Sequence, residues 1–206
     1  MRQCTLIPRR LTVQKPPDIS FIVTAHSKPQ ALRLTLLSLQ QQKKAKCEIL
    51  VSNNANGIAK AAIKSVCNEM GIREVVNDAP ECYSAIERLA PLATGKFLCF
   101  PSEEDYYTPV FATKLLTHAR RYKLQLVYCD SLYDSRYIGS YEVMRVQPII
   151  GHIDKGGFLL RRNLFNGFPG TPDEAVASLC DGYLVEKLRA EGISFGKIPE
   201  VLWVHN

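Results

Sequence analysis

The chain has 206 residues, 46% of them apolar, and a formal net charge of +6. A chain of this length can bury a substantial core, so we expect one domain. No run of about 18 apolar residues could cross a bilayer, and the N-terminus lacks the apolar stretch of a signal peptide. The basic residues form short, scattered runs without an RNA-binding or helix-turn-helix pattern, so we expect a solvated basic surface and no nucleic-acid partner.

Seven cysteines are spread along the chain, an odd number without any C-x-x-C spacing. This pattern argues against a zinc site and against a disulfide framework. Cys47, Cys99 and Cys129 lie in apolar, strand-like runs and are expected to act as small core residues. We therefore expect a protein of a reducing compartment, namely the cytoplasm.

The first elements alternate between strand and helix patterns. Residues 19–24 form an apolar, β-branched run, and residues 27–30 have the spacing of a capping box with proline inside the first turn. A helix should begin there, and a strand should follow over residues 48–52. The apolar face of this helix carries Leu32, Leu36 and Leu39.

The alternation continues with a helix before the strand of residues 73–76 and a third helix that should stop at Gly95. Residues 96–100 read as a buried strand, after which Thr108 and Pro109 should cap a helix that precedes a strand over residues 125–129. Such alternation predicts an α/β fold with a mainly parallel sheet covered by helices on both faces. Ligands of such sheets bind at the carboxyl ends of the strands.

The regular alternation of strand and helix patterns ends in the last third of the chain. Residues 133–145 alternate aromatic and polar side chains, as a solvent-facing hairpin does. A short strand is expected over residues 158–161 and a helix over residues 183–190, and residues 193–203 close the chain as a strand-like run.

Three consecutive carboxylates, Glu103, Glu104 and Asp105, directly follow the buried strand that ends at residue 100. Adjacent carboxylates repel one another unless a cation lies among them, and Mg²⁺ or Mn²⁺ prefers oxygen ligands shared with phosphate. The alternative is a solvated loop that caps the next helix at its positive end. The position of these carboxylates at the ligand-binding edge of the sheet favours the metal-binding interpretation.

Several blocks of the sequence together resemble the family 2 glycosyltransferases, which have the GT-A fold. The blocks are ISFIVT (19–24), SLQQQ (38–42), EILVSNN (48–54), ATGKFLCF (93–100), VYCD (127–130), GFLLR (157–161), DGYL (181–184) and IPEVLW (198–203). No block is specific alone, but their order and spacing match over nearly everything after Asp18. The resemblance implies one GT-A domain over residues 18–206, with a nucleotide-binding half (18–109) and an acceptor half (110–206), behind a basic arm (1–17).

The family moves a sugar from a nucleotide diphosphate to a hydroxyl acceptor. In this chain the resemblance implies that two segments bind the nucleotide-sugar. They are the loop of Thr24, Ala25 and His26, and the pair Asn53 and Asn54 after the second strand. The family usually has an acidic residue at that second place, but an amide can still pair with a uracil edge, so a UDP-sugar is favoured. His26 could equally be an ordinary exposed loop residue.

The D-x-D motif of the family maps onto Ser102-Glu103-Glu104. Glu104 then takes the place of the metal ligand for Mn²⁺ or Mg²⁺, with Asp105 and His205 beside it, and Glu103 contacts the nucleotide-sugar. Ser102 is a departure, because it brings no charge. The alternative for His205 is an exposed residue near the end of the chain.

Asp181 matches the family's catalytic base, which takes the proton of the acceptor hydroxyl in an inverting transfer. Its alternative role is N-cap of the following helix. We expect Asp130, Lys155, Gly156 and Gly157 to line the acceptor side, where glycines permit close approach of a sugar. The acceptor would be a saccharide or lipid-linked, with peripheral membrane association or a homodimer helping to hold it.

Two rival functions remain at this point. Ser102, Asn53 and Glu87, which replaces part of an Arg-Asn pair frequent in the family, favour a degenerate module that binds a sugar nucleotide or a protein without turnover. A nucleotidyltransferase would need a glycine-rich phosphate loop after the first strand, and the sequence has none there.

Overall fold

The computed structural model describes residues 15–79, 81–135, 140–169 and 179–206. The predicted arm, residues 1–17, therefore lies almost entirely outside the described residues. The strands are β1 (Ile19–Ala25), β2 (Cys47–Asn53), β3 (Arg73–Val76), β4 (Phe97–Cys99), β5 (Tyr106–Tyr107), β6 (Leu126–Ser135), β7 (Ser140–Met144), β8 (Phe158–Arg161) and β9 (Phe195–His205). The α-helices in this part of the chain are α1 (Pro29–Gln40), α2 (Gly57–Glu69), α3 (Cys82–Leu89), α4 (Phe111–Tyr122) and α5 (Cys180–Ala190). Short 3-10 turns are η1 (Ala90–Leu92), η2 (Lys155–Gly157) and η3 (Arg162–Leu164).

The strands form one nine-stranded sheet in the order β3-β2-β1-β4-β8-β6-β9-β5, and β7 pairs with β6. β3, β2, β1 and β4 run parallel, as do β6 and β9, which confirms the expected mostly parallel α/β sheet. β8 is antiparallel to both of its neighbours. It enters the sheet from the η2 turn and not from a crossover helix, so its direction is reversed.

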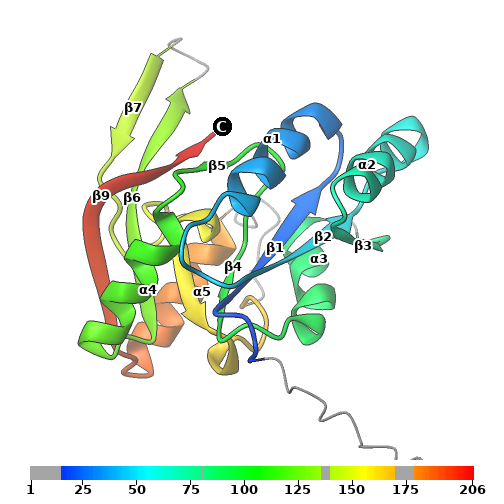
Figure 1. Ribbon diagram of the computed structural model, residues 1–206. Helices are drawn as coiled ribbons and strands as arrows, with labels where there is room; N and C mark the ends of the chain where they lie inside the picture. Colours follow the sequence, from blue (N-terminus) through cyan, green and yellow to red (C-terminus); the bar gives the residue numbers. More distant parts are fainter. Residues whose placement is uncertain (1–14, 80, 136–139, 170–178) are drawn as a thin grey trace, which may run out of the picture.

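Helices cover both faces of the sheet. Along β1, Phe21 and Val23 face the cluster that also contains the buried sides of α1, α2 and α4, whereas Ile22 faces the cluster of α3 and α5. This two-residue alternation is the geometry of a strand that is buried on both sides. Figure 1 shows α1 and α4 in front of the sheet and α5 behind it.

The predicted helix ends are partly wrong. The residues 27–30 do not form a capping box, because α1 has Lys28 as N-cap and no capping side chain of its own. Nor does Thr108 cap α4 with its hydroxyl, which is buried and has no hydrogen-bond partner among the described residues. The third helix ends before Gly95, which serves packing: a Cβ there would lie 2.4 Å from the backbone nitrogen of Ser20.

The predicted hairpin is confirmed for its described part. β6 and β7 pair antiparallel from Ser131 with Met144 to Ser135 with Ser140. This hairpin projects beyond the rest of the sheet at the upper left of Figure 1. The predicted core cysteines are also found inside, Cys99 and Cys129 fully buried and Cys47 half-buried.

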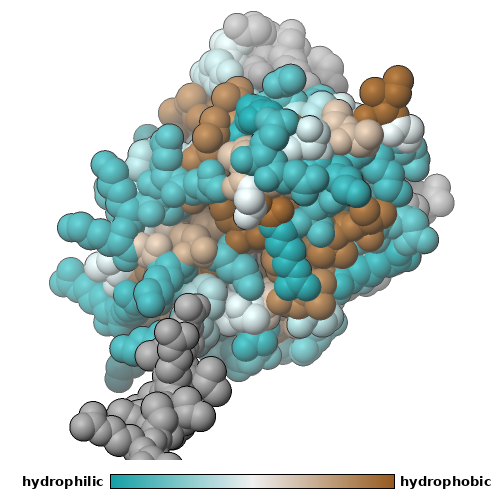
Figure 2. All heavy atoms as spheres, turned by 45° about the vertical axis from the view of Figure 1, so that its right-hand side comes forward, coloured by the Kyte–Doolittle hydropathy of each residue, from teal (hydrophilic) through white to brown (hydrophobic). Residues whose placement is uncertain are grey.

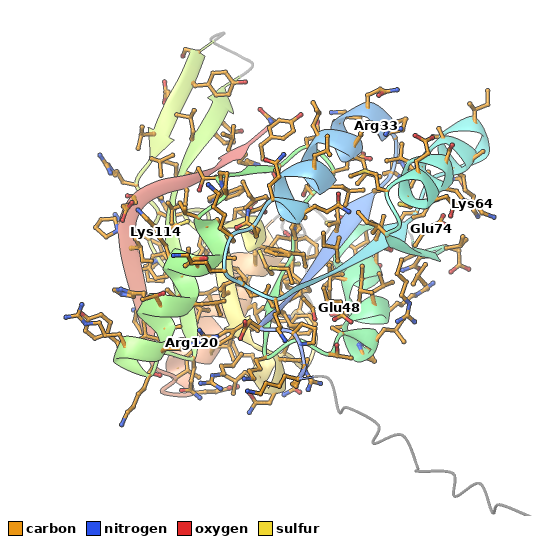
Figure 3. The ribbon with its side chains drawn as sticks, in the orientation of Figure 1. Arg33, Glu48, Lys64, Glu74, Lys114 and Arg120 are labelled. Carbon is orange, nitrogen blue, oxygen red and sulfur yellow. The ribbon has the colours of Figure 1, made fainter. Side chains whose placement is uncertain are left out.

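Charged side chains are distributed over the surface. The labelled basic residues of Figure 3 come from separate helices: Arg33 from α1, Lys64 from α2, and Lys114 and Arg120 from α4. Several make ion pairs, such as Lys114 with Glu200. Seen from the α2 side, hydrophilic side chains cover most of the surface and apolar ones form separate patches (Figure 2). The expected solvated basic surface agrees with this arrangement.

Candidate functional site

A cavity of about 330 Å³ opens where β1, β2 and β4 end. We call it the donor cavity. Its lining residues are Thr24, Ala25, His26, Asn54, Glu81, Cys82, Ser102, Glu103 and Glu104. Parallel strands bring these loops to one edge of the sheet, as the sequence predicted. A larger groove of about 600 Å³, between α3 and residues 162–168, shares no residue with this cavity.

Glu103 binds the start of α1. Its carboxylate accepts hydrogen bonds from the backbone N–H groups of His26 (3.1 Å), Ser27 (3.0 Å) and Lys28 (3.0 Å). The Thr35 hydroxyl donates to its backbone carbonyl at 2.9 Å. An anion at a helix N-terminus satisfies N–H groups that lack partners within the helix and opposes the positive end of its dipole. The carboxylate predicted to contact the nucleotide-sugar is therefore engaged in holding the loop after β1.

The two other acidic residues of the cluster are also engaged, in different directions. Glu104 forms an ion pair with Lys28. Asp105 is fully buried, where Oδ2 accepts from the backbone N–H of Ser102 at 2.7 Å and Oδ1 lies 3.1 Å from His205 Nδ1. Across the described residues, no group of three or more His, Cys, Asp or Glu side chains is arranged to hold a metal ion. The metal site predicted from Glu104, Asp105 and His205 is thus not assembled.

His205 is half-buried, with 26% of its side chain exposed, and it contacts Asp105, so it differs from the freely exposed terminal residue of the alternative. Burial lowers its pKa, but the bond to Asp105 and the charge of Asp154 outweigh burial and raise the pKa above the usual value. Burial raises the pKa of Asp105 above the usual aspartate range, against the opposing effect of His205. The His205 ring stacks on Tyr133 with 5.4 Å between ring centroids.

Lys155 lies beneath Ser102. The lysine is only 6% exposed, and its Nζ donates to Ser102 Oγ at 2.9 Å. Burial disfavours its charge, yet the nearby Asp154, Asp105 and Asp181 together raise its pKa above the ordinary lysine value. The raised pKa favours the charged ammonium form of Lys155, which reaches the donor cavity through its bond to Ser102.

A second, smaller cavity of about 140 Å³ is lined by Asp181, which accepts a hydrogen bond from the backbone N–H of Lys155. We call it the acceptor cavity. Its lining residues are Ser131, Tyr133, Met144, Gly151, Ile153, Asp154, Leu179, Asp181, Trp203 and His205. Aromatic rings and two carboxylates thus face the same space.

Asp181 is placed at this cavity by the first turn of α5. It is 5% exposed, its Oδ2 accepts from the backbone N–H of Lys155 at 3.1 Å, and its Oδ1 accepts from Gly182 at 2.8 Å. Burial and then the charge of Asp154 raise the pKa of Asp181 to about 6. The N-cap of α5 is Leu179, so the predicted alternative of Asp181 as N-cap is wrong.

Asp154 was missed by the sequence reasoning. Its Oδ1 accepts from the backbone N–H of Gly156 at 2.7 Å, and its Oδ2 lies 3.9 Å from His205 Nε2. The only signal was its position next to Lys155 in the chain, because its partner His205 is distant in sequence.

The two predicted acceptor glycines serve packing. A Cβ on Gly156 would lie 2.9 Å from Asp105 Oδ2, and a Cβ on Gly157 would lie 2.7 Å from Trp203 Nε1. Both are buried, and neither lines the acceptor cavity. The absence of a side chain at these glycines lets Asp105 and Trp203 pack closely against the backbone.

Two predicted site residues are structural instead. Asn53 is fully buried, where its side-chain amide bonds the carbonyl of Lys60 at 3.0 Å and Glu74 at 2.6 Å, so only Asn54 of the pair lines the donor cavity. Asp130 is also fully buried. It accepts from the backbone N–H of Val146 at 2.9 Å and pairs with Lys197 and Arg145, which ties the base of the hairpin to β9.

A family model described as "Glycosyl transferase family 2" matches residues 20–172. The chain belongs to this family. The resemblance drawn from the sequence blocks is thereby confirmed. Among curated protein sequences, none matches the chain.

Solved structures share the fold at low sequence identity. TarS 1–349 of S. aureus in complex with UDP has a TM-score of 0.71 at 14% identity, over 91% of this chain and 60% of that one. The mannosyltransferase PcManGT of Pyrobaculum calidifontis, in complex with GDP-Man and Mn²⁺, has a TM-score of 0.72 at 15% identity, over 93% and 57%. The chain thus spans less than two thirds of these proteins.

A third similar structure is glucosyl-3-phosphoglycerate synthase from Mycobacterium tuberculosis, in complex with Mn²⁺, UDP and phosphoglyceric acid. Its TM-score is 0.63 at 15% identity, over 92% of this chain and 71% of that one. These likenesses confirm the predicted GT-A fold. No helix in the described part of the chain is long and apolar enough to span a membrane.

Proposed function

We propose that this domain transfers a sugar from a nucleotide diphosphate to a hydroxyl acceptor, with inversion at the anomeric carbon. The observation that carries the proposal is the carboxylate of Asp181, whose pKa is raised to about 6, in a small cavity. Lys155 links Asp181 to the donor cavity, because its backbone N–H donates to Asp181 and its Nζ donates to Ser102. A general base is most effective when its pKa lies near the working pH. Family membership supports the same chemistry.

The nucleotide would occupy the donor cavity, with its base near Asn54 and its phosphates towards Ser102. A volume of about 330 Å³ lies within the range of small-molecule sites. A UDP-sugar remains the favoured donor, because an asparagine amide can pair with a uracil edge. TarS, which binds UDP and UDP-GlcNAc in its solved complexes, supports this choice, whereas PcManGT binds GDP-Man.

The acceptor hydroxyl would enter the acceptor cavity beside Asp181. Its oxygen attacks the anomeric carbon, the bond from that carbon to the diphosphate oxygen breaks, and the electron pair leaves with the diphosphate. Asp181 takes the hydroxyl proton as the new bond forms. Tyr133 and Trp203 offer apolar ring surface against which a sugar or the head of a lipid-linked saccharide could pack.

Two of the similar structures, PcManGT and glucosyl-3-phosphoglycerate synthase, hold Mn²⁺, but the donor set of the described residues does not fit such an ion. Glu103 is bound to the start of α1, Glu104 to Lys28, and Asp105 to His205. We assign the transfer step to the protein side chains alone.

A specific observation also favours a second function, that of a binding module without turnover. The acidic residues at the place of the family's metal-binding motif form hydrogen bonds and an ion pair within the protein. Such a module would bind the nucleotide-sugar in the donor cavity but would not cleave it into sugar and nucleotide.

The test is release of UDP from a panel of UDP-sugars, first with water and then with simple glycosides as acceptors. We expect slow release by the wild-type protein and its loss in D181N, while the affinity for UDP stays within about threefold, since Asp181 lies outside the donor cavity. The matched control is D78N, which changes an exposed aspartate. Binding of UDP-sugars without release by any variant would favour the binding module, and equal loss of release and UDP affinity in D181N would make Asp181 structural.

A further inference from the structure

We propose that the ammonium group of Lys155, together with the hydroxyl of Ser102, binds the diphosphate of the donor in place of a divalent metal ion. This inference rests on the proposed function. It deepens that function by assigning the group that faces the leaving diphosphate.

The residues at the three motif positions are uncharged or already paired. At the three motif positions, Ser102 brings a neutral hydroxyl, Glu103 accepts three backbone hydrogen bonds and Glu104 pairs with Lys28. At phosphate sites a cation such as Mg²⁺ is held by one or two carboxylates together with substrate phosphates. In this chain the carboxylates of Glu103 and Glu104 already have other partners, so we assign the positive charge that faces a diphosphate to another group.

The ammonium of Lys155 has fewer partners among the described residues than it has donors. An ammonium group has three donors. Among the described residues, Nζ of Lys155 makes one hydrogen bond, to Ser102 Oγ, and no salt bridge. A buried charge with unused donors is costly unless a ligand completes its bonds. Phosphate oxygens would satisfy the remaining donors.

Lys155 is connected to residues of both cavities. The partner of Nζ, Ser102, lines the donor cavity, and so does Cys82, whose pKa is affected by the charge of Lys155. On the other side, Asp154 and Asp181 line the acceptor cavity and act on Lys155 electrostatically. Lys155 therefore lies between the two cavities. In the proposed transfer, the bond that breaks has to lie at this same boundary.

Several negative charges surround Lys155. Three carboxylates, those of Asp105, Asp154 and Asp181, act on the ammonium of Lys155. A diphosphate added to these carboxylates without a cation would be repelled. A fixed ammonium between them and the diphosphate opposes this repulsion in a partly buried site, where its field is weakly screened. Lys155 keeps its proton throughout, because the leaving oxygen takes only the electron pair of the broken bond.

The experiment is calorimetric titration of the whole chain with UDP, GDP, UMP and uridine, in EDTA and again in Mn²⁺. We expect UDP to bind in EDTA with an affinity within about threefold of that in Mn²⁺. We expect K155M to weaken UDP binding about 10- to 100-fold, the value of one or two charge-assisted hydrogen bonds, and to leave uridine binding unchanged. K64M, which removes an exposed lysine of α2, is the matched control and should not alter UDP binding.

Each other outcome decides against the inference. UDP binding that requires Mn²⁺ would overturn it and leave the proposed function standing, and so would unchanged UDP affinity in folded K155M. Absence of binding by UDP, GDP and uridine under both conditions would overturn the inference and the proposed function together. If K155M does not fold, the wild-type comparison in EDTA and Mn²⁺, with the electron paramagnetic resonance signal of free Mn²⁺ as a second readout, still decides.

Discussion

Replacing Glu103 by alanine should destabilise the whole domain, because this carboxylate holds the start of α1. The change would leave the backbone N–H groups of His26, Ser27 and Lys28 without their present acceptor. A hydrogen bond to a charged group contributes about 1.5–3 kcal/mol. Water can reach part of this loop and the three bonds share one carboxylate, so we expect a total loss of about 3–5 kcal/mol.

Thermal unfolding followed by circular dichroism measures this effect. For a domain of this size, 1 kcal/mol corresponds to about 2–4 °C, so E103A should lower the Tm by roughly 6–20 °C. E69A is the control, because Glu69 forms an exposed ion pair with Arg33 and such pairs contribute about 1 kcal/mol or less. A Tm for E103A within about 2 °C of the E69A value would refute the capping role and return Glu103 to the ligand site.

Two further predictions follow from the same contacts. Since a base acts only when deprotonated and the pKa of Asp181 is raised to about 6, the rate of sugar transfer should rise between about pH 5 and 7 and then level off; a rate that stays constant over this interval would contradict the assignment. G95A should destabilise the fold by at least about 2–3 kcal/mol, because the added Cβ meets the backbone of Ile19 and Ser20 within 2.6 Å. Urea unfolding measures the loss. The comparison is G192A, where the added Cβ meets nothing and costs only the backbone strain of alanine at a φ of +78°, about 1–2 kcal/mol. Equal midpoints for both variants would show that the packing at Gly95 adjusts.

The sequence alone determined the architecture of this protein. Strands buried on both faces need continuous apolar runs, and helices between them need apolar residues at helical spacing, so β1, α1 and β2 could be predicted from residues close together in the chain. The order of these elements then set the ligand-binding edge of the sheet and brought Thr24, Ala25, His26 and Asn54 to it. The resemblance to the family likewise rests on short blocks of residues that are neighbours in the chain.

Only the tertiary structure decided what the charged residues do. A carboxylate looks the same in sequence whether it binds a metal, an ammonium or a helix start, and its role depends on which group is folded against it. Glu103 meets the start of α1, Asp105 meets His205, and Lys155 meets Ser102, all across long intervals of chain. Local patterns contain no information about such pairings, because the burial and electrostatic forces that select them act only once the sheet has formed.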